Sequence, residues 1–214
     1  GALAGTDAVL VVLTRLNRIL HLDPVRRRAV VEPGVVNARL SEAALPHGLY
    51  YAPDPSSQSA CTLGGNVAEN AGGPHCLKYG VTTNHVAALE VLLPTAELVR
   101  LGSRSGEAWG PDLVGLFVGS EGMFGIATEI TLRLEPLPAA VRTLLAAFPS
   151  IRAASEAVSG IIAAGIVPAA MEMMDQACVR AVEASIYAAG YPIDAAAVLL
   201  VEVDGSAEAV QAEA

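Results

Sequence analysis

Alternating apolar and polar positions predict strands in the first part of the chain. In residues 126–134 every second residue is suited to a buried face, while Glu129, Thr131 and Arg133 lie on the other face. Residues 87–93 and 98–101 flank Pro94-Thr95-Ala96-Glu97 and predict a hairpin. These segments indicate a sheet.

The N-terminal part predicts two further strands and one helix. Residues 9–13 are β-branched and apolar enough for a buried strand, and residues 29–31 predict a second strand. Residues 35–44 follow Pro33-Gly34 and carry apolar side chains at helical spacing. We therefore expect strands early in the chain, followed by one short helix.

A second pattern begins after Glu135-Pro136-Leu137-Pro138, a stiff connector of the kind found at domain boundaries. Beyond it, apolar segments alternate with helical segments that Ser150, Asp175 and Ser206 can cap. The expected elements are strands at residues 143–148, 166–174 and 196–203 and helices at residues 151–164, 176–189 and 207–214. This β-α-β-α-β module predicts one domain over residues 1–138 and a second over residues 139–214.

Composition limits the class of protein. Of the 214 residues, 53% are hydrophobic and 16% are charged, which excludes general disorder. A net charge of −9 and a pI near 4.8 argue against binding to nucleic acid. No apolar run reaches the roughly 18 residues of a membrane helix. The three cysteines lack the spacing of a zinc site or a disulfide framework, which predicts a reducing, cytoplasmic setting.

From Tyr50 to Gly80 the sequence is rich in Pro, Ser, Gly and Asn, with little periodicity. Its first cluster comprises Pro53-Asp54-Pro55-Ser56-Ser57 and Thr62-Leu63-Gly64-Gly65-Asn66, in which hydroxyl donors accompany glycines that let a ligand approach the backbone. We expect Asn66 to cap a short helix whose unpaired N–H groups face an anion. A surface turn with ordinary capping explains the same residues, so both interpretations stay open at this point.

A second cluster, Gly119-Ser120-Glu121-Gly122-Met123-Phe124-Gly125-Ile126, leads into the strand predicted at residues 126–134. Its glycines permit a tight turn whose backbone can contact the polar edge of a planar ring. The sequence has neither the Lys-Ser/Thr pair of a P-loop nor the G-x-G-x-x-G of a Rossmann fold, which excludes both nucleotide-binding motifs. Two such clusters favour one shared ligand with a planar ring and phosphates.

These residues resemble a known family. Residues 53–57, 63–73, 77–80 and 119–126 are similar to the FAD-binding domain, of PCMH type, in the vanillyl-alcohol oxidase family of flavoproteins. Within that family the likeness is strongest to the FAD-linked D subunit of bacterial glycolate oxidase and to D-lactate dehydrogenases. The resemblance implies an α+β fold, in which this FAD-binding domain is followed by the first part of a ferredoxin-like β-α-β cap that binds substrate.

The resemblance also implies which residues contact FAD. One group would line the pyrophosphate and ribityl chain: Pro53, Asp54, Pro55, Ser56, Ser57, Thr62, Gly64, Gly65 and Asn66. A second group would pack near the flavin: Gly72, Gly73, Tyr79 and Gly80. A third group would hold the cofactor mainly through its backbone: Glu121, Gly122, Gly125 and Ile126. No catalytic residue is assigned, because relatives carry their catalytic base and a histidine-rich, often metal-binding motif later in the cap.

The activity implied by the resemblance is oxidation of a 2-hydroxy acid, glycolate or D-lactate, to the 2-oxo acid by hydride transfer to flavin N5. The alternative is a non-catalytic flavin-binding or structural subunit of an oxidase complex. The implied partners are the small acid and other glycolate oxidase subunits, including an iron–sulfur subunit. Such a complex could attach a cytoplasmic protein to a membrane.

Some positions depart from the family pattern or stand apart from it. Only residues 1–5 correspond to the family's first phosphate loop, so we expect an excised portion of a longer protein with little activity of its own. Ala96 stands where relatives carry glycine, which predicts a turn without positive φ. Among the histidines, His21 and His47 are expected at the surface and His75 and His85 beside the flavin, and none has the spacing of a metal site.

Overall fold

The structure, a computed structural model, describes residues 5–103 and 110–214, so only Gly5 of the proposed phosphate-loop remnant is described. The chain forms two units: Gly1–Gly72 with Val81–Pro136, and Gly73–Gly80 with Leu137–Ala214. We refer to Gly73–Gly80 as the strap. Sequence reasoning did not foresee that the strap belongs to the second unit, and the domain boundary at residue 138 stays a prediction.

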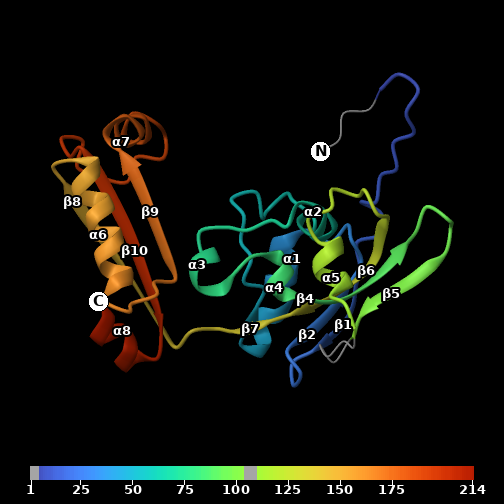
Figure 1. Cartoon of the computed structure of the whole chain (residues 1–214). Coiled ribbons are helices and arrows are strands. Elements are labelled where there is room, and N and C mark those ends of the chain that lie inside the picture. Colours follow the sequence, from blue (N-terminus) through green and yellow to red (C-terminus); the bar gives the residue numbers. More distant parts are fainter. Residues whose placement is uncertain (1–4, 104–109) are drawn as a thin grey trace. The chain divides into compact units, whose positions relative to one another are not determined.

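A five-stranded antiparallel sheet organises the first unit, in the order β1-β2-β6-β4-β5 (Figure 1). Its strands are β1 (Ile19–Asp23), β2 (Arg28–Val31), β4 (Val86–Leu92), β5 (Leu98–Gly102) and β6 (Ile126–Arg133). One face of the sheet is packed into the core around Val31, Val91, Ile130 and Leu132, all of which are fully buried. The strands predicted at residues 29–31, 87–93, 98–101 and 126–134 are confirmed.

Short helices and a small ladder complete the first unit. The helices are α1 (Asn37–Ala44), the 3-10 turn η1 (Leu45–His47), α2 (Leu63–Glu69), α4 (Thr82–His85) and α5 (Leu113–Phe117). The ladder pairs β3 (Leu49–Tyr50) with β7 (Glu135–Pro136). Helix α1 buries Leu40 and Ala44 in the core, so the helix predicted at residues 35–44 is confirmed with a later start.

The strand predicted at residues 9–13 is wrong. Val9, Leu10, Val11 and Val12 form no strand, and each is between 59% and 89% exposed. An apolar segment becomes a strand only when a neighbouring strand pairs with its backbone, and none does so within the described residues. Composition alone therefore did not predict burial.

The hairpin of β4 and β5 closes through a left-handed residue. The Ala96 N–H donates to the Leu93 carbonyl at 2.9 Å, and Ala96 adopts a φ of +65°. A turn that ends in a left-handed residue fits the twist of the two strands. The prediction that alanine marks a turn without positive φ is therefore wrong.

The second unit contains a three-stranded antiparallel sheet, in the order β8-β10-β9, with helices packed against it (Figure 1). Its elements are β8 (Ala140–Phe148), α6 (Ile151–Ala163), β9 (Ala170–Asp175), α7 (Gln176–Glu183), β10 (Ala197–Gly205) and α8 (Ala207–Glu213). Ser150, Asp175 and Ser206 each accept a backbone hydrogen bond at 2.7 to 3.2 Å, as predicted for N-caps. The β-α-β-α-β order and the α+β class are confirmed, although β9 and α7 are shorter than predicted.

The strap contains one helical turn, α3 (Cys76–Tyr79), none of whose residues is buried. Its contacts lie with the second unit and are described below. Within the ranges 5–103 and 110–214, no helix is both long enough and apolar enough to cross a membrane.

Candidate functional site

The two glycine-rich clusters meet in the first unit. The carbonyls of Val67 and Ala68, in α2, accept hydrogen bonds from the N–H groups of Gly119 at 2.8 Å and Glu121 at 2.9 Å. Both clusters also line one largely apolar cavity of about 150 Å³. Its lining residues are Leu13, Pro33, Gly64, Val67, Ala68, Phe117, Gly122, Gly125, Ile126 and Ala127. The structure thus brings together segments that lie about 60 residues apart in the sequence.

Helix α2 begins earlier than predicted. Thr62 has an extended backbone, and its Oγ1 accepts a hydrogen bond from the Gly65 N–H at 3.3 Å, which makes Thr62 the N-cap. Gly64 and Gly65 therefore lie in the first turn of the helix. Asn66 lies inside the helix and is only 2% exposed, so its prediction as the cap is wrong.

The first turn of α2 has no N–H group left for an anion. The N–H groups of residues 63–66 all donate within the protein, at 2.7 to 3.3 Å, to oxygens of Val35, Pro33 and Thr62. The prediction of unpaired N–H groups at this helix is therefore wrong. A phosphate near this turn must take its hydrogen bonds from other donors.

The adjacent glycines of α2 serve different purposes. A Cβ on Gly64 would lie 2.6 Å from the Cβ of Pro33 and 2.9 Å from its carbonyl oxygen, so Gly64 permits close packing inside the protein. The nearest atom to a Cβ on Gly65 is the Thr62 Oγ1 at 3.4 Å, and Gly65 is exposed. Of the two, Gly65 is the one that leaves room for a ligand.

Two buried amides connect α1, α2 and the loop at residues 53–57. Asn66 Nδ2 donates to Asn37 Oδ1 at 2.8 Å, and Asn37 Nδ2 donates to the Pro53 carbonyl at 3.1 Å. Because buried amides lose free energy unless they are hydrogen-bonded, this chain fixes the loop beside α2. Sequence reasoning missed Asn37, although a polar residue three positions before the buried Leu40 was a signal for it.

The loop itself presents donors at the surface. Pro53 is buried, Asp54 and Pro55 are half-buried, and Ser56 and Ser57 are exposed. The hydroxyls of Ser56 and Ser57 are therefore accessible to a ligand. Hydroxyl groups can donate to phosphate oxygens without adding positive charge.

The second cluster folds into what we call the glycine turn, residues 119–125. Four of its residues have positive φ values: +83° for Gly119, +54° for Glu121, +78° for Gly122 and +155° for Gly125. A Cβ on Gly125 would lie 2.6 Å from the Leu92 carbonyl oxygen, which only glycine avoids. The Ser120 Oγ is buried and has no hydrogen-bond partner in the described parts of the chain. An unpaired buried hydroxyl of this kind is suited to a ligand that supplies the missing partner.

The remaining predicted cofactor residues end the first unit or lie in the strap. Gly72 is the last residue of its segment in the first unit, whereas Gly73, Tyr79 and Gly80 belong to the second. The Tyr79 hydroxyl donates to Asp204 Oδ2 at 2.5 Å. The structure therefore divides the predicted cofactor residues between the two units.

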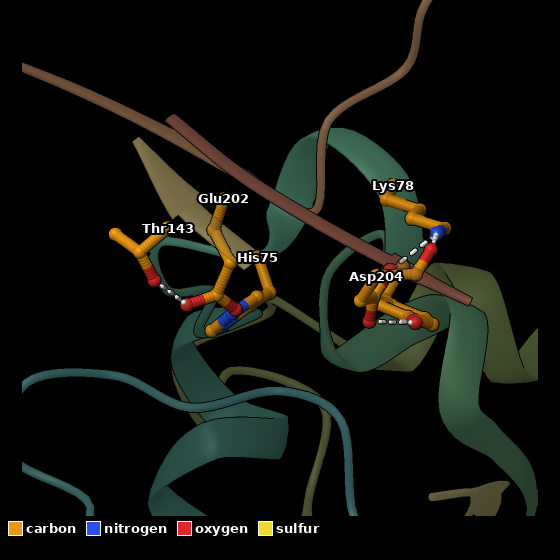
Figure 2. A network of polar contacts seen from close by, with 6 residues as sticks. His75, Lys78, Thr143, Glu202 and Asp204 are labelled. Carbon is orange, nitrogen blue, oxygen red and sulfur yellow. Dashed lines mark hydrogen bonds and ion pairs between the residues drawn. The ribbon is translucent and has the colours of Figure 1, made fainter. Parts of the chain in front are cut away.

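The histidines differ in their surroundings. His21 and His47 are exposed, as predicted. His75 Nε2 lies 2.9 Å from Glu202 Oε1 in the second unit (Figure 2). His85 is buried in the first unit, where its ring and that of Tyr51 form a T-shaped pair with centroids 5.9 Å apart. Burial raises the pKa of Tyr51 above its ordinary value. In the parts of the chain described by the structure, no group of three or more His, Cys, Asp or Glu side chains could hold a metal ion.

Comparison with known proteins decides the family. Residues 1–102 match the profile described as FAD binding domain, and residues 137–214 match the one described as FAD linked oxidases, C-terminal domain. The chain belongs to the FAD-linked oxidases. The resemblance drawn from the sequence and the predicted cofactor, FAD, are thereby confirmed.

Curated relatives of this FAD-linked oxidase extend well beyond the chain. The glycolate oxidase subunit GlcD of Escherichia coli K12 is 53% identical over 211 residues, which are 99% of this chain and 42% of that protein. GlcD of Bacillus subtilis is 44% identical over 213 residues, and a D-lactate dehydrogenase of Anaerostipes hadrus is 36% identical over 214 residues. These two matches cover 99% and 97% of this chain and 45% of each relative. The chain thus spans less than half the length of these relatives.

A solved structure supports the fold. An alkyldihydroxyacetonephosphate synthase matches with a TM-score of 0.76 and 22% identity, over 94% of this chain and 39% of that protein. At this identity the match shows a shared fold and nothing about activity or substrate.

The residues of the first unit fit FAD in part. The apolar cavity between α2 and the glycine turn, the open face of Gly65 and the unpaired Ser120 hydroxyl provide places for a ring and a polar chain. The cavity is smaller than the several hundred Å³ of a typical cofactor pocket, so it can enclose only a portion of FAD. The exposed serines of residues 53–57 are suited to the phosphates.

Proposed function

We propose that the full-length protein oxidises a 2-hydroxy acid, glycolate or D-lactate, to the 2-oxo acid. The names of the relatives support this choice of substrates. The observation that carries the proposal is the hydrogen-bonded contact of the glycine turn with α2, because it joins both predicted cofactor clusters around one cavity.

We propose that this chain contributes the cofactor site. The exposed hydroxyls of Ser56 and Ser57 would donate to the phosphates, and Gly65 would admit the polar chain against α2. The apolar walls of the cavity would exclude water from the part of the cofactor that they enclose. When bound, FAD supplies the acceptor for the hydride that leaves the α-carbon of the substrate. The further cofactor residues in the glycine turn and the strap stay predictions.

Partners are proposed from the same relatives. A protein whose relatives are subunits of glycolate oxidase would act in a multi-subunit complex. The iron–sulfur subunit implied by the resemblance of the sequence would be one route for electrons. We propose a cytoplasmic location, with membrane attachment only through such a complex.

Gly65→Ala separates cofactor binding from folding. The new methyl group meets no protein atom closer than 3.4 Å, so we expect the unfolding midpoint of the chain to stay within about 2 °C of the original or to rise. If Gly65 admits FAD, the Kd for FAD, measured by quenching of its fluorescence, should rise by about tenfold or more. Gly160→Ala, in the middle of α6 with open space around it, is the matched control and should leave the Kd unchanged.

The proposed reaction is tested by anaerobic reduction of the flavin in the full-length protein. Its flavin absorbance should bleach without oxygen on addition of glycolate or D-lactate. Bound flavin that does not bleach with either acid would favour a non-catalytic subunit, and an unchanged Kd in Gly65→Ala would contradict the proposed cofactor site.

A further inference from the structure

Three arginines meet at one end of the five-stranded sheet of the first unit. Arg28 begins β2 and Arg133 ends β6, and the two are direct partners in the antiparallel pairing of these strands. Arg27 precedes Arg28 in the turn between β1 and β2. We refer to Arg27, Arg28 and Arg133 as the arginine cluster. Because the glycine turn leads into the other end of β6, roughly 23 Å of strand separates the cluster from the candidate cofactor site.

Hydrogen bonds to backbone carbonyls hold the cluster in place. The Arg27 carbonyl accepts from the Leu134 N–H at 3.0 Å and from Arg28 Nη1 at 3.3 Å. Arg27 adopts a φ of +51°, a left-handed conformation that is unfavourable for a residue with a side chain. Arg133 Nη1 donates to the Asn84 carbonyl at 2.8 Å. Neutral oxygens thus orient the guanidinium groups of Arg28 and Arg133, and each group keeps further N–H donors.

The chain does not fully neutralise the positive charge of the cluster. Among the residues that the structure describes, no carboxylate forms an ion pair with Arg27, Arg28 or Arg133. Burial lowers the pKa of Arg28, and the charges of Arg133 and Arg27 lower it further. Glu135 opposes this effect without reversing it. Like charges that lie directly opposite each other in a ladder are destabilising, and here both partners are also half-buried.

We propose that the arginine cluster is a binding site for an oxyanion, which Arg28 and Arg133 hold between their guanidinium groups. A phosphate or carboxylate group accepts paired hydrogen bonds from a guanidinium group, and its negative charge offsets the repulsion between the two arginines. Two sources carry this chemistry, free phosphate and an acidic segment of a partner protein, and the experiment distinguishes them. The site lies apart from the proposed cofactor site and does not depend on the proposed function.

Nuclear magnetic resonance titration of the whole chain with inorganic phosphate tests the site. Sodium chloride is lowered as phosphate is added, so that the ionic strength and the screening of exposed charges stay constant. We expect saturable shifts of the amides of residues 27–29 and 132–134, and none in α6. Arg28→Gln and Arg133→Gln should each raise the Kd for phosphate by about tenfold. Arg28→Lys should raise it by less, since lysine keeps the charge but cannot form the paired hydrogen bonds.

Arg26→Gln is the matched control for these variants. It removes the same charge from the same turn, but Arg26 is exposed and already pairs with Asp23 at 3.0 Å. We therefore expect the Kd for phosphate to change by less than about twofold. An equal loss of affinity in Arg26→Gln and Arg28→Gln would show diffuse attraction to positive charge and would overturn the site.

A second titration uses a hexaglutamate peptide, which carries carboxylates and no phosphate. Tighter binding of the peptide than of phosphate identifies an acidic segment as the source of the oxyanion, and tighter binding of phosphate identifies free phosphate. If neither probe gives saturable shifts in residues 27–29 and 132–134, the proposal is overturned. If Arg28→Gln does not fold, Arg133→Gln and Arg28→Lys carry the comparison with Arg26→Gln.

Discussion

The glycine turn of the first unit and the strap of the second unit are short, irregular segments that are fixed in different ways. The glycine turn is bound through its backbone, because the N–H groups of Gly119 and Glu121 donate to carbonyls of α2. The strap is bound through side chains, with Lys78 and Tyr79 contacting Asp204. A backbone-bound segment depends on the absence of Cβ atoms, whereas a side-chain-bound segment depends on charge.

The largest effect is expected when a Cβ is added to the glycine turn. In Gly125→Ala the new atom would lie 2.6 Å from the Leu92 carbonyl oxygen, at a φ of +155°. We expect the free energy of unfolding of the first unit to fall by about 3 kcal/mol, measured by urea denaturation followed by circular dichroism. In Gly160→Ala, in α6 of the second unit, where space is open, the free energy of unfolding of the second unit should stay equal or rise by up to about 1 kcal/mol. A change below about 0.5 kcal/mol in Gly125→Ala would show that the turn tolerates a side chain.

Removal of the strap's charge should have a smaller effect. Lys78→Met leaves the buried Asp204 carboxylate without its ammonium partner, so we expect the free energy of unfolding of the second unit to fall by about 2 kcal/mol. This is less than for a fully buried ion pair, because Lys78 is partly exposed. Added salt should also speed amide exchange in the strap of the unsubstituted chain and leave the Gly119 and Glu121 amides unaffected. Arg152→Met, which removes only an exposed pair with Glu156 at 3.9 Å, is the control. Equal salt responses in strap and glycine turn would contradict the comparison.

The smallest effect is a gain in stability. Glu121 adopts a φ of +54° in the glycine turn, and Ala96 a φ of +65° in the β4–β5 hairpin. Since a left-handed residue with a side chain costs about 1 kcal/mol, Glu121→Gly and Ala96→Gly should each raise the unfolding free energy by about 0.5 to 1 kcal/mol. Thermal unfolding of both variants tests this. A loss in Glu121→Gly alongside a gain in Ala96→Gly would reveal a stabilising contact of the Glu121 side chain.

Signals confined to a few neighbouring residues were sufficient to predict much of the fold. Ser150, Asp175 and Ser206 cap their helices as expected, because an N-cap bonds only three residues ahead. The same reasoning misplaced the start of α2, since Thr62 and Asn66 are both good caps and the choice depends on carbonyls of Pro33 and Val35. Alternatives of this kind are decided by packing that a short window of sequence does not contain.

Contacts between distant residues could not be predicted. Lys78 and Asp204 are 126 residues apart, and nothing in the sequence around either residue indicates the other. Residues 9–13 show the same limit, because a strand needs a partner whose presence the segment itself does not reveal. For the candidate site, the two glycine clusters were recognised from the sequence, while the amide chain through Asn37 and the roles of Gly64 and Gly65 required the structure.

In the sequence, the strap lies between the two segments of the first unit, although it belongs to the second unit. No uninterrupted stretch of the gene therefore specifies the second unit. A polypeptide that starts at Leu137 would retain β8, β9 and β10 but would lack the lysine and tyrosine that satisfy Asp204. Chimeras that exchange this unit between related oxidases should therefore transplant Gly73–Gly80 together with the region from Leu137 onward.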